Sequence, residues 1–343
     1  MKIRPLLVVV SSVALTFFVL LCSVPGWSTD ARDGTIVKSE ACKMTPLTHA
    51  QDLENIKKTY ESESAVARGR GLTPLPFDQL PEPTEATWTL IRAHEGFECR
   101  QIRYMSDGLE ISAFLYKPVH TNGRRLPVVI INRGGSRDLG AWDPWGFTRS
   151  AYEYGNAGFV VLASQYRGGG GSQGEDEFGG ADVDDVLNLI TAAKSLNYAD
   201  SGNIFMAGAS RGGMMTCLAI RRKAPIRAAF IVSGMFDLEE NARDRPEMKR
   251  NFQQMIPGFR EHEAERYRDR SAVYWAQEIT VPVLILHGTA DWRVDVSQAL
   301  AFAQELQRQK KTYELMIFPN DSHGVPVYRR PSTSIEWFKK FMQ

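Results

Sequence analysis

Short apolar runs alternate with longer helix-like stretches through most of this 343-residue chain. The apolar runs, each too short for a helix, are residues 127–132, 159–164, 203–207, 228–233, 281–287 and 313–318. Helical patterns follow several of them, at residues 181–196, 212–223, 297–310 and 334–342. Strands that alternate with helices predict a mostly parallel sheet covered by helices on both faces. Residues 93–105 and 109–118 predict an antiparallel hairpin that precedes it.

The N-terminus predicts an export segment. Residues 6–22 carry no charge and follow the cations Lys2 and Arg4, and Gly26 and Ser28 are small residues of the kind that signal peptidase reads. We expect residues 1–28 to be a signal peptide cleaved near Ser28, or a membrane anchor through residues 6–22 if they are not cleaved. The mature protein is then expected to be exported, either periplasmic or secreted.

Residues 29–86 predict an extension and residues 87–343 the catalytic domain. The extension is polar, with a helix-like stretch at residues 51–68 and a proline-rich passage at residues 74–83 that cannot pair as a central strand. Cleavage of the export segment leaves Cys42, Cys99 and Cys217. In an oxidising compartment Cys42 and Cys99 can form a disulfide, and three unpaired thiols are the open alternative.

Charge excludes some partners. The 41 Lys and Arg residues nearly balance the 40 Asp and Glu residues, so no net positive field exists to hold a nucleic acid. No His, Cys and carboxylate cluster has zinc spacing, and Asp182, Asp184 and Asp185 suit the start of a helix better than a metal site. We therefore expect neither a metal nor a cofactor.

A candidate nucleophile follows the run at residues 203–207. Gly208-Ala209-Ser210-Arg211-Gly212 is a G-x-S-x-G sequence between a predicted strand and a predicted helix. Glycines at both flanks let the backbone turn sharply there, which would lift the Ser210 hydroxyl above the sheet.

A serine nucleophile needs a base, and the base needs an acid to orient it. Asp291 follows the strand predicted at residues 281–287, and His323 follows the last one, at residues 313–318. Serine, acid and histidine thus occur in the order typical of α/β hydrolases, each at a strand end. Asp321 is the rival acid, and His287 is expected to be a packed, hydrogen-bonded core histidine.

Two loops are candidates for the oxyanion hole. The amide of Arg211 follows the nucleophile, and Gly134 and Gly135 follow the strand predicted at residues 127–132. Arg133, in the same loop, is a candidate for binding a substrate carboxylate or the oxyanion.

These motifs resemble the catalytic domain of the prolyl oligopeptidase family of serine peptidases, over roughly residues 88–343. The resemblance rests on five segments: residues 165–168, 182–186, 208–213, 282–294 and 321–324. It implies an α/β-hydrolase fold and the triad Ser210, Asp291 and His323. Tyr166, in the first of these segments, is a further candidate for substrate binding. The chain departs from the family in two ways. Residues 29–86 are too few for the β-propeller of the full-length enzymes, and Arg133 stands where the family usually has Tyr or His.

We therefore predict a serine hydrolase that acts through an acyl-enzyme on a peptide or ester. A prolyl-oligopeptidase-like peptidase is the first interpretation, and a carboxylesterase acting on small acyl esters is the alternative. A non-catalytic binding protein on the same fold is the second alternative.

Overall fold

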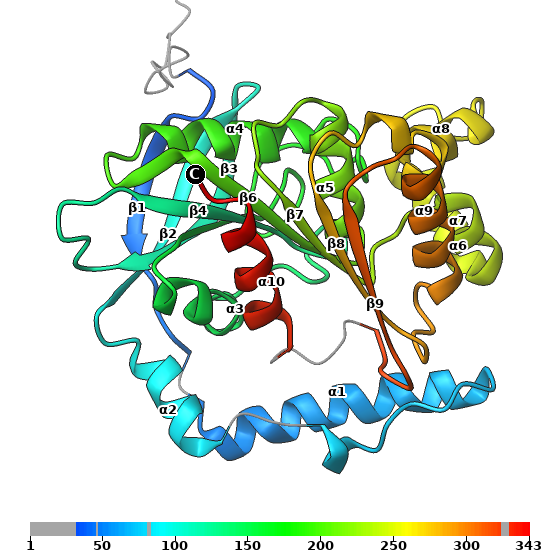
Figure 1. Cartoon of the computed structure of the whole chain (residues 1–343), viewed down its shortest axis with the longest axis horizontal. Helices are drawn as coiled ribbons and strands as arrows, with labels where there is room; N and C mark the ends of the chain where they lie inside the picture. The colour runs from blue at the N-terminus through cyan, green and yellow to red at the C-terminus, as the bar shows by residue number, and fades with distance from the viewer. Residues whose placement is uncertain (1–31, 46, 81–83, 324–328) are drawn as a thin grey trace, which may run out of the picture. The chain divides into compact units, whose positions relative to one another are not determined.

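The computed structural model describes residues 32–45, 47–80, 84–323 and 329–343 (Figure 1). The expected export segment at residues 1–28 lies outside these ranges. Within them, no helix combines the length and the apolar character needed to cross a membrane. The described residues all belong to one compact unit.

A single sheet organises the described part of the chain, with strands in the order β1-β2-β3-β5-β4-β6-β7-β8-β9. The strands are β1 (Ile36–Ala41), β2 (Phe97–Ser106), β3 (Leu109–Pro118), β4 (Leu126–Asn132), β5 (Val160–Ser164), β6 (Ala199–Ala209), β7 (Ala229–Val232), β8 (Val283–Gly288) and β9 (Tyr313–Phe318). Antiparallel pairing joins β1, β2, β3 and β5, and parallel pairing joins every neighbour from β5 to β9. The predicted fold class is confirmed.

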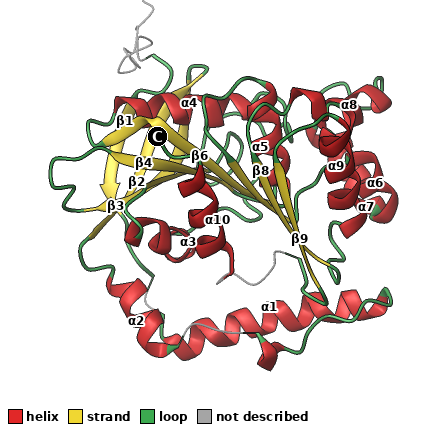
Figure 2. Ribbon diagram, in the orientation of Figure 1, coloured by secondary structure: helices red, strands yellow, loops and turns green. Residues whose placement is uncertain are grey.

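Helices cover both faces of the sheet (Figure 2). They are α1 (His49–Gly69), α2 (Glu85–Ala93), α3 (Pro144–Asn156), α4 (Asp182–Ser195), α5 (Arg211–Arg221), α6 (Leu238–Asp244), α7 (Pro246–Met255), α8 (Glu263–Arg270), α9 (Val296–Arg308) and α10 (Arg329–Lys340). Apolar side chains of α4, α5 and α9 form one core with the sheet, and those of α3 and α10 form a second core on the other face. Every residue of β5 and β7 is buried, as a strand covered on both sides requires.

Three parts of this architecture were not predicted. Glu85–Ala93 forms α2, so the hairpin predicted from residue 93 begins only at Phe97. Ile36–Ala41 of the extension adds β1 to the antiparallel edge of the sheet, where it pairs with β2. The helices α6, α7 and α8 occupy the connection between β7 and β8. Almost every residue of β1 is exposed, so its sequence lacks the alternation of apolar and polar residues that predicts a strand.

The direction of the strands places the candidate residues at one edge. Because β4, β6, β8 and β9 run parallel, their carboxyl ends lie at the same edge of the sheet. The segments that follow these ends contain Gly134, Ser210, Asp291 and His323.

A disulfide fastens the extension to the sheet. Cys42 comes directly after β1 and is bonded to Cys99 in β2, with the two Cα atoms 5.4 Å apart. The amide of Cys42 also donates to the Cys99 carbonyl at 3.0 Å. Of the two alternatives that the sequence left open, the structure contains the paired cysteines, while Cys217 is a buried free thiol.

We predict that the double substitution Cys42→Ser and Cys99→Ser lowers the free energy of unfolding by about 4 kcal/mol. The cysteines are 57 residues apart in sequence, so their bond restricts a long loop in the unfolded chain. Urea unfolding followed by tryptophan fluorescence measures the loss. A reducing agent should shift the wild-type midpoint and leave that of the double variant unchanged. Identical midpoints for both proteins in oxidising buffer would contradict the prediction.

Candidate active site

Ser210 lies on a strained turn between β6 and α5. Its φ of 57° and ψ of −125° fall where residues with a side chain are rarely found. Glycines make the turn possible, since a Cβ at Gly208 would lie 2.2 Å from the Gly212 carbonyl oxygen and one at Gly212 would lie 2.0 Å from the Asn132 oxygen. The predicted strand-turn-helix setting of Ser210 is therefore present, and α5 begins at the next residue.

His323 and Asp291 form a hydrogen-bonded pair. The Nδ1 atom of His323 lies 2.9 Å and 2.8 Å from the two carboxylate oxygens of Asp291. Because an ionised carboxylate only accepts, Nδ1 carries the proton, and Nε2 of the neutral ring remains as the base. The two residues come from the ends of β9 and β8, as the sequence predicted.

Further donors hold the Asp291 carboxylate. The amides of Arg293 and Val294 donate to its Oδ1 atom at 2.9 Å and 3.0 Å. Nε2 of His287 lies 3.2 Å from its Oδ2 atom and 2.9 Å from the Val294 carbonyl, so this nitrogen carries a proton. Burial by itself raises the pKa of Asp291, but His323 and His287 outweigh it and hold the pKa well below its usual value. Asp291 is therefore ionised at neutral pH.

Asp321, the rival acid, contributes backbone contacts beside the pair. Its carbonyl accepts from the Ala290 amide at 3.0 Å. A Cβ at Gly288 would lie 2.1 Å from the same oxygen, so the loop of His323 lies directly against the end of β8. These contacts bring the segments that carry Asp291 and His323 together.

Gly134 and Gly135 lie in the loop that passes the nucleophile. A Cβ at Gly134 would lie 3.2 Å from the Cβ of Ser210 and 3.8 Å from its Oγ, so this backbone is close to the hydroxyl. Gly135 has a φ of 69°, and a Cβ there would lie 2.0 Å from the Leu139 carbonyl oxygen. The shape of the loop therefore requires a glycine at position 135, and it brings the backbone of Gly134 close to the nucleophile.

The side chain of Arg133 points into the same loop. Its guanidinium donates five hydrogen bonds, all to backbone carbonyls: those of Gly134, Arg137, Leu139 and, twice, Gln165. The residue is 1% exposed. These contacts hold the loop together and fasten it to Gln165 after β5. The substrate binding expected from the sequence is the alternative that Arg133→Met tests.

A buried ion cluster behind the nucleophile was not predicted. The Arg211 guanidinium donates to both oxygens of Asp176, at 2.7 Å and 2.8 Å, and also to Asp182. It donates as well to the Gly135 carbonyl at 3.0 Å, so it connects the nucleophile turn with the Gly134–Gly135 loop. Although burial opposes it, the two carboxylates raise the pKa of Arg211. The sequence signal for this cluster is Arg211 itself, a charged residue in a motif that otherwise contains small residues.

Tyr166 lies between the two buried arginines. The guanidinium carbons of Arg133 and Arg211 lie 5.1 Å and 5.3 Å from the centre of its ring. Its hydroxyl donates to the Arg133 carbonyl at 3.2 Å, and the side chain is buried. Tyr166 therefore packs the layer beneath the site, and its predicted contact with substrate stays a prediction.

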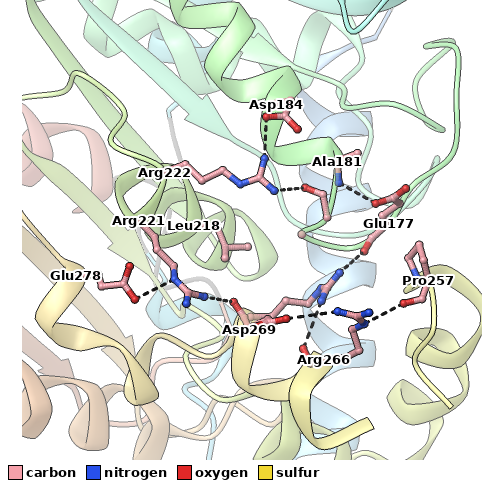
Figure 3. Close-up of a pocket in the computed structure, with 13 residues that line it drawn as sticks. Glu177, Ala181, Asp184, Leu218, Arg221, Arg222, Pro257, Arg266, Asp269 and Glu278 are labelled. Atoms are coloured by element: carbon pink, nitrogen blue, oxygen red, sulfur yellow. Dashed lines mark hydrogen bonds and ion pairs between the residues drawn. The ribbon is translucent and has the colours of Figure 1, made fainter. Parts of the chain in front are cut away.

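A pocket of about 650 Å³ opens elsewhere, beside the far end of α5 (Figure 3). None of Ser210, Asp291 and His323 lines it. Its arginines already have carboxylate partners, since Arg221 pairs with Glu278, Arg222 with Asp184 and Arg266 with Asp269; Arg270 donates to backbone carbonyls. Among the described residues, no group of three His, Cys, Asp or Glu is arranged to hold a metal.

Known proteins share this sequence and this fold. The chain is 26% identical over 226 residues to the uncharacterized peptidase YtmA of Bacillus subtilis, which covers 66% of this chain and 86% of that protein. It is 25% identical over 244 residues to the acylamino-acid-releasing enzyme of Arabidopsis thaliana, or 64% of this chain and 31% of that protein. The acylaminoacyl peptidase structure of Pyrococcus horikoshii superimposes with a TM-score of 0.61 at 24% identity, covering 74% of this chain and 42% of that one. This last likeness shows the fold, and the chain spans less than half of the last two proteins.

The sequence model of the prolyl oligopeptidase family matches residues 145–343, which include Ser210, Asp291 and His323. Because the match spans more than half of the chain, the protein belongs to the prolyl oligopeptidase family.

Proposed function

We propose that the protein is a serine peptidase that cleaves peptide bonds through an acyl-enzyme formed on Ser210. The hydrogen bond between His323 and Asp291, at the same sheet edge as the strained Ser210 turn, is the observation that carries the proposal. Relatives named as peptidases support the substrate class.

The mechanism follows from these positions. Ser210 Oγ attacks the scissile carbonyl while Nε2 of His323 takes its proton, and Asp291 stabilises the imidazolium that forms. The oxyanion is held by the Arg211 amide, at the start of α5, and by an amide of the Gly134–Gly135 loop. His323 then protonates the leaving amine, and a water molecule, deprotonated by the same nitrogen, hydrolyses the acyl-enzyme.

Export is part of the proposal. The disulfide between Cys42 and Cys99 suits an oxidising compartment, and it supports the interpretation of residues 1–28 as an export segment. The substrates would then be extracytoplasmic peptides.

We predict that Ser210→Ala abolishes peptide hydrolysis and covalent labelling by a fluorophosphonate. Loss of a triad nucleophile typically lowers turnover about a millionfold, whereas removal of one hydroxyl leaves the fold intact. Blocked peptide amides, aminoacyl amides and short acyl esters assayed in parallel measure the activity, and intact-mass spectrometry measures the label. Labelling that persists in Ser210→Ala would place the nucleophile elsewhere. If the protein hydrolyses the esters and none of the amides, it is a carboxylesterase and not a peptidase.

The acid can be tested by two matched substitutions. Asp291→Asn should lower turnover by roughly ten-thousandfold, because an asparagine favours the wrong tautomer of His323. Asp321→Asn should cost far less, since the contacts that tie the His323 loop to β8 use the Asp321 backbone. Steady-state kinetics on one peptide substrate compares the two. A greater loss in Asp321→Asn would show that Asp321 is the acid.

We predict that Arg133→Met slows neutral substrates and substrates with a free carboxylate by the same factor, about tenfold to hundredfold. The guanidinium contacts only backbone carbonyls, so its loss loosens the oxyanion loop for every substrate. The kcat/KM ratio of a matched substrate pair measures this. Arg137→Met, an exposed arginine in the same loop, is the control. A selective loss on the carboxylate substrate would instead assign Arg133 to substrate binding.

A further inference from the structure

Helix α1 lies outside the segment that matches the family, yet it reaches the loop that carries the acid. In Figure 1 it runs below the sheet, with its C-terminal half beneath the end of β9. Only Asp52, Ser64 and Ala67 of its 21 residues are buried. Apolar packing over so few side chains does not explain its position, so its polar contacts matter.

Glu63 makes the contact with the acid loop. Its carboxylate accepts from Nε1 of Trp292 at 2.8 Å and from Nε and Nη2 of Arg293 at 2.7 Å and 2.5 Å. These donors belong to the two residues that directly follow Asp291. The amide of the same Arg293 donates to Asp291. Glu63 therefore binds the side chains of the short turn after Asp291. A backbone amide of the same turn binds the Asp291 carboxylate.

The segment after α1 contacts the other loop of the pair. The Leu75 amide donates to the carbonyl of Asn320, three residues before His323, at 3.0 Å. Tyr60 of α1 in turn donates its hydroxyl to the Leu75 carbonyl at 2.7 Å. The extension thus contacts both the acid-bearing and the histidine-bearing segment.

The Glu63 contact differs from the two ion pairs that lie within α1 itself. Glu54 with Lys58 and Glu61 with Lys57 are single contacts of 3.5 Å and 3.9 Å between side chains that are about half exposed or more. Exposed pairs of that kind contribute little. The side chain of Glu63 is 24% exposed, and its pair with Arg293 is bidentate. Although burial opposes it, Arg293, Trp292 and His323 hold the pKa of Glu63 below its usual value.

We propose that Glu63 is a positioning residue for the Asp291–His323 pair, which makes α1 a part of the active site. The proposal rests on the proposed function. Glu63 acts through Arg293: its carboxylate fixes the guanidinium, the guanidinium fixes the turn, and the turn amides fix Asp291. It contacts no reacting atom, so its loss changes the alignment of the base and leaves the groups that contact substrate in place.

Glu63→Gln should therefore lower kcat by about tenfold to hundredfold, with KM close to that of the wild type. Glu54→Gln is the matched control, because it removes a carboxylate from the same helix and from a pair that contacts neither loop. Both variants should remain folded at the assay temperature, while only Glu63→Gln should slow fluorophosphonate labelling of Ser210.

A double-mutant cycle with Arg293→Gln tests the route of the effect. Each single variant should lose a similar factor in kcat, and the double variant should lose no more than the larger single loss. Arg293→Gln also supplies the test if Glu63→Gln does not fold.

The outcomes separate this proposal from the proposed function. A wild-type protein that the fluorophosphonate does not label at Ser210 would contradict the proposed function. Labelling of the wild type at Ser210, with equal labelling rates in Glu63→Gln and Glu54→Gln, would overturn the positioning role alone. A raised KM at unchanged kcat, or multiplicative losses in the double variant, would also overturn it.

Discussion

Buried charge that must be paired or hydrogen-bonded shapes the loops at the carboxyl edge of the sheet. Arg133, Arg211, Asp176, Asp182 and Asp291 are all buried there, and an unpaired charge in a protein interior costs several kcal/mol. Loops lack the regular backbone hydrogen bonds of strands and helices, so hydrogen bonds from these charged side chains hold the loop backbone instead. The Arg133 guanidinium joins its own loop to Gln165 after β5, and the Arg211 guanidinium joins the nucleophile turn to Gly135 of the same loop and to Asp176. The position of the Ser210 turn relative to the oxyanion loop therefore depends on paired charges beneath it.

The parts that the sequence predicts well are local. Apolar runs near residues 159–164 and 228–233 predict β5 and β7 because a strand buried on both faces must be apolar throughout. The setting of Ser210 is also local, since strand, glycine turn and helix follow one another in the chain. Ser210, Asp291 and His323 each follow the end of a parallel strand. Because parallel strands end on the same side of a sheet, the three residues lie at one edge.

The parts that could not be predicted depend on pairs distant in sequence. Asp176 and Asp182 lie 35 and 29 positions before Arg211, and no periodicity connects them. The carboxylates of residues 182–185 were interpreted as favourable charges at a helix start, and that explanation is incomplete for Asp182 and Asp185. Asp182 pairs with Arg211, and Asp185 pairs with Arg167 at 2.8 Å. Glu63 and Arg293, 230 positions apart, are an extreme case.

Contacts between residues far apart in sequence also connect the N-terminal extension to the candidate site. A disulfide fixes β1 to β2 at one end of the extension, and Glu63 fixes α1 to the turn after Asp291 farther along the chain. Between these points, Asp52 of α1 accepts from Nε1 of Trp88 in α2 at 3.0 Å, which fastens the start of the helix to the segment that leads into the sheet. A helix held at both ends by directional contacts has little freedom to drift from the site. The disulfide ends on the sheet, the Asp52 contact ends on α2, which leads into β2, and the Glu63 contact ends on the turn after Asp291. Asp291 is therefore connected to the sheet along two routes, directly through β8 and around the molecule through α1.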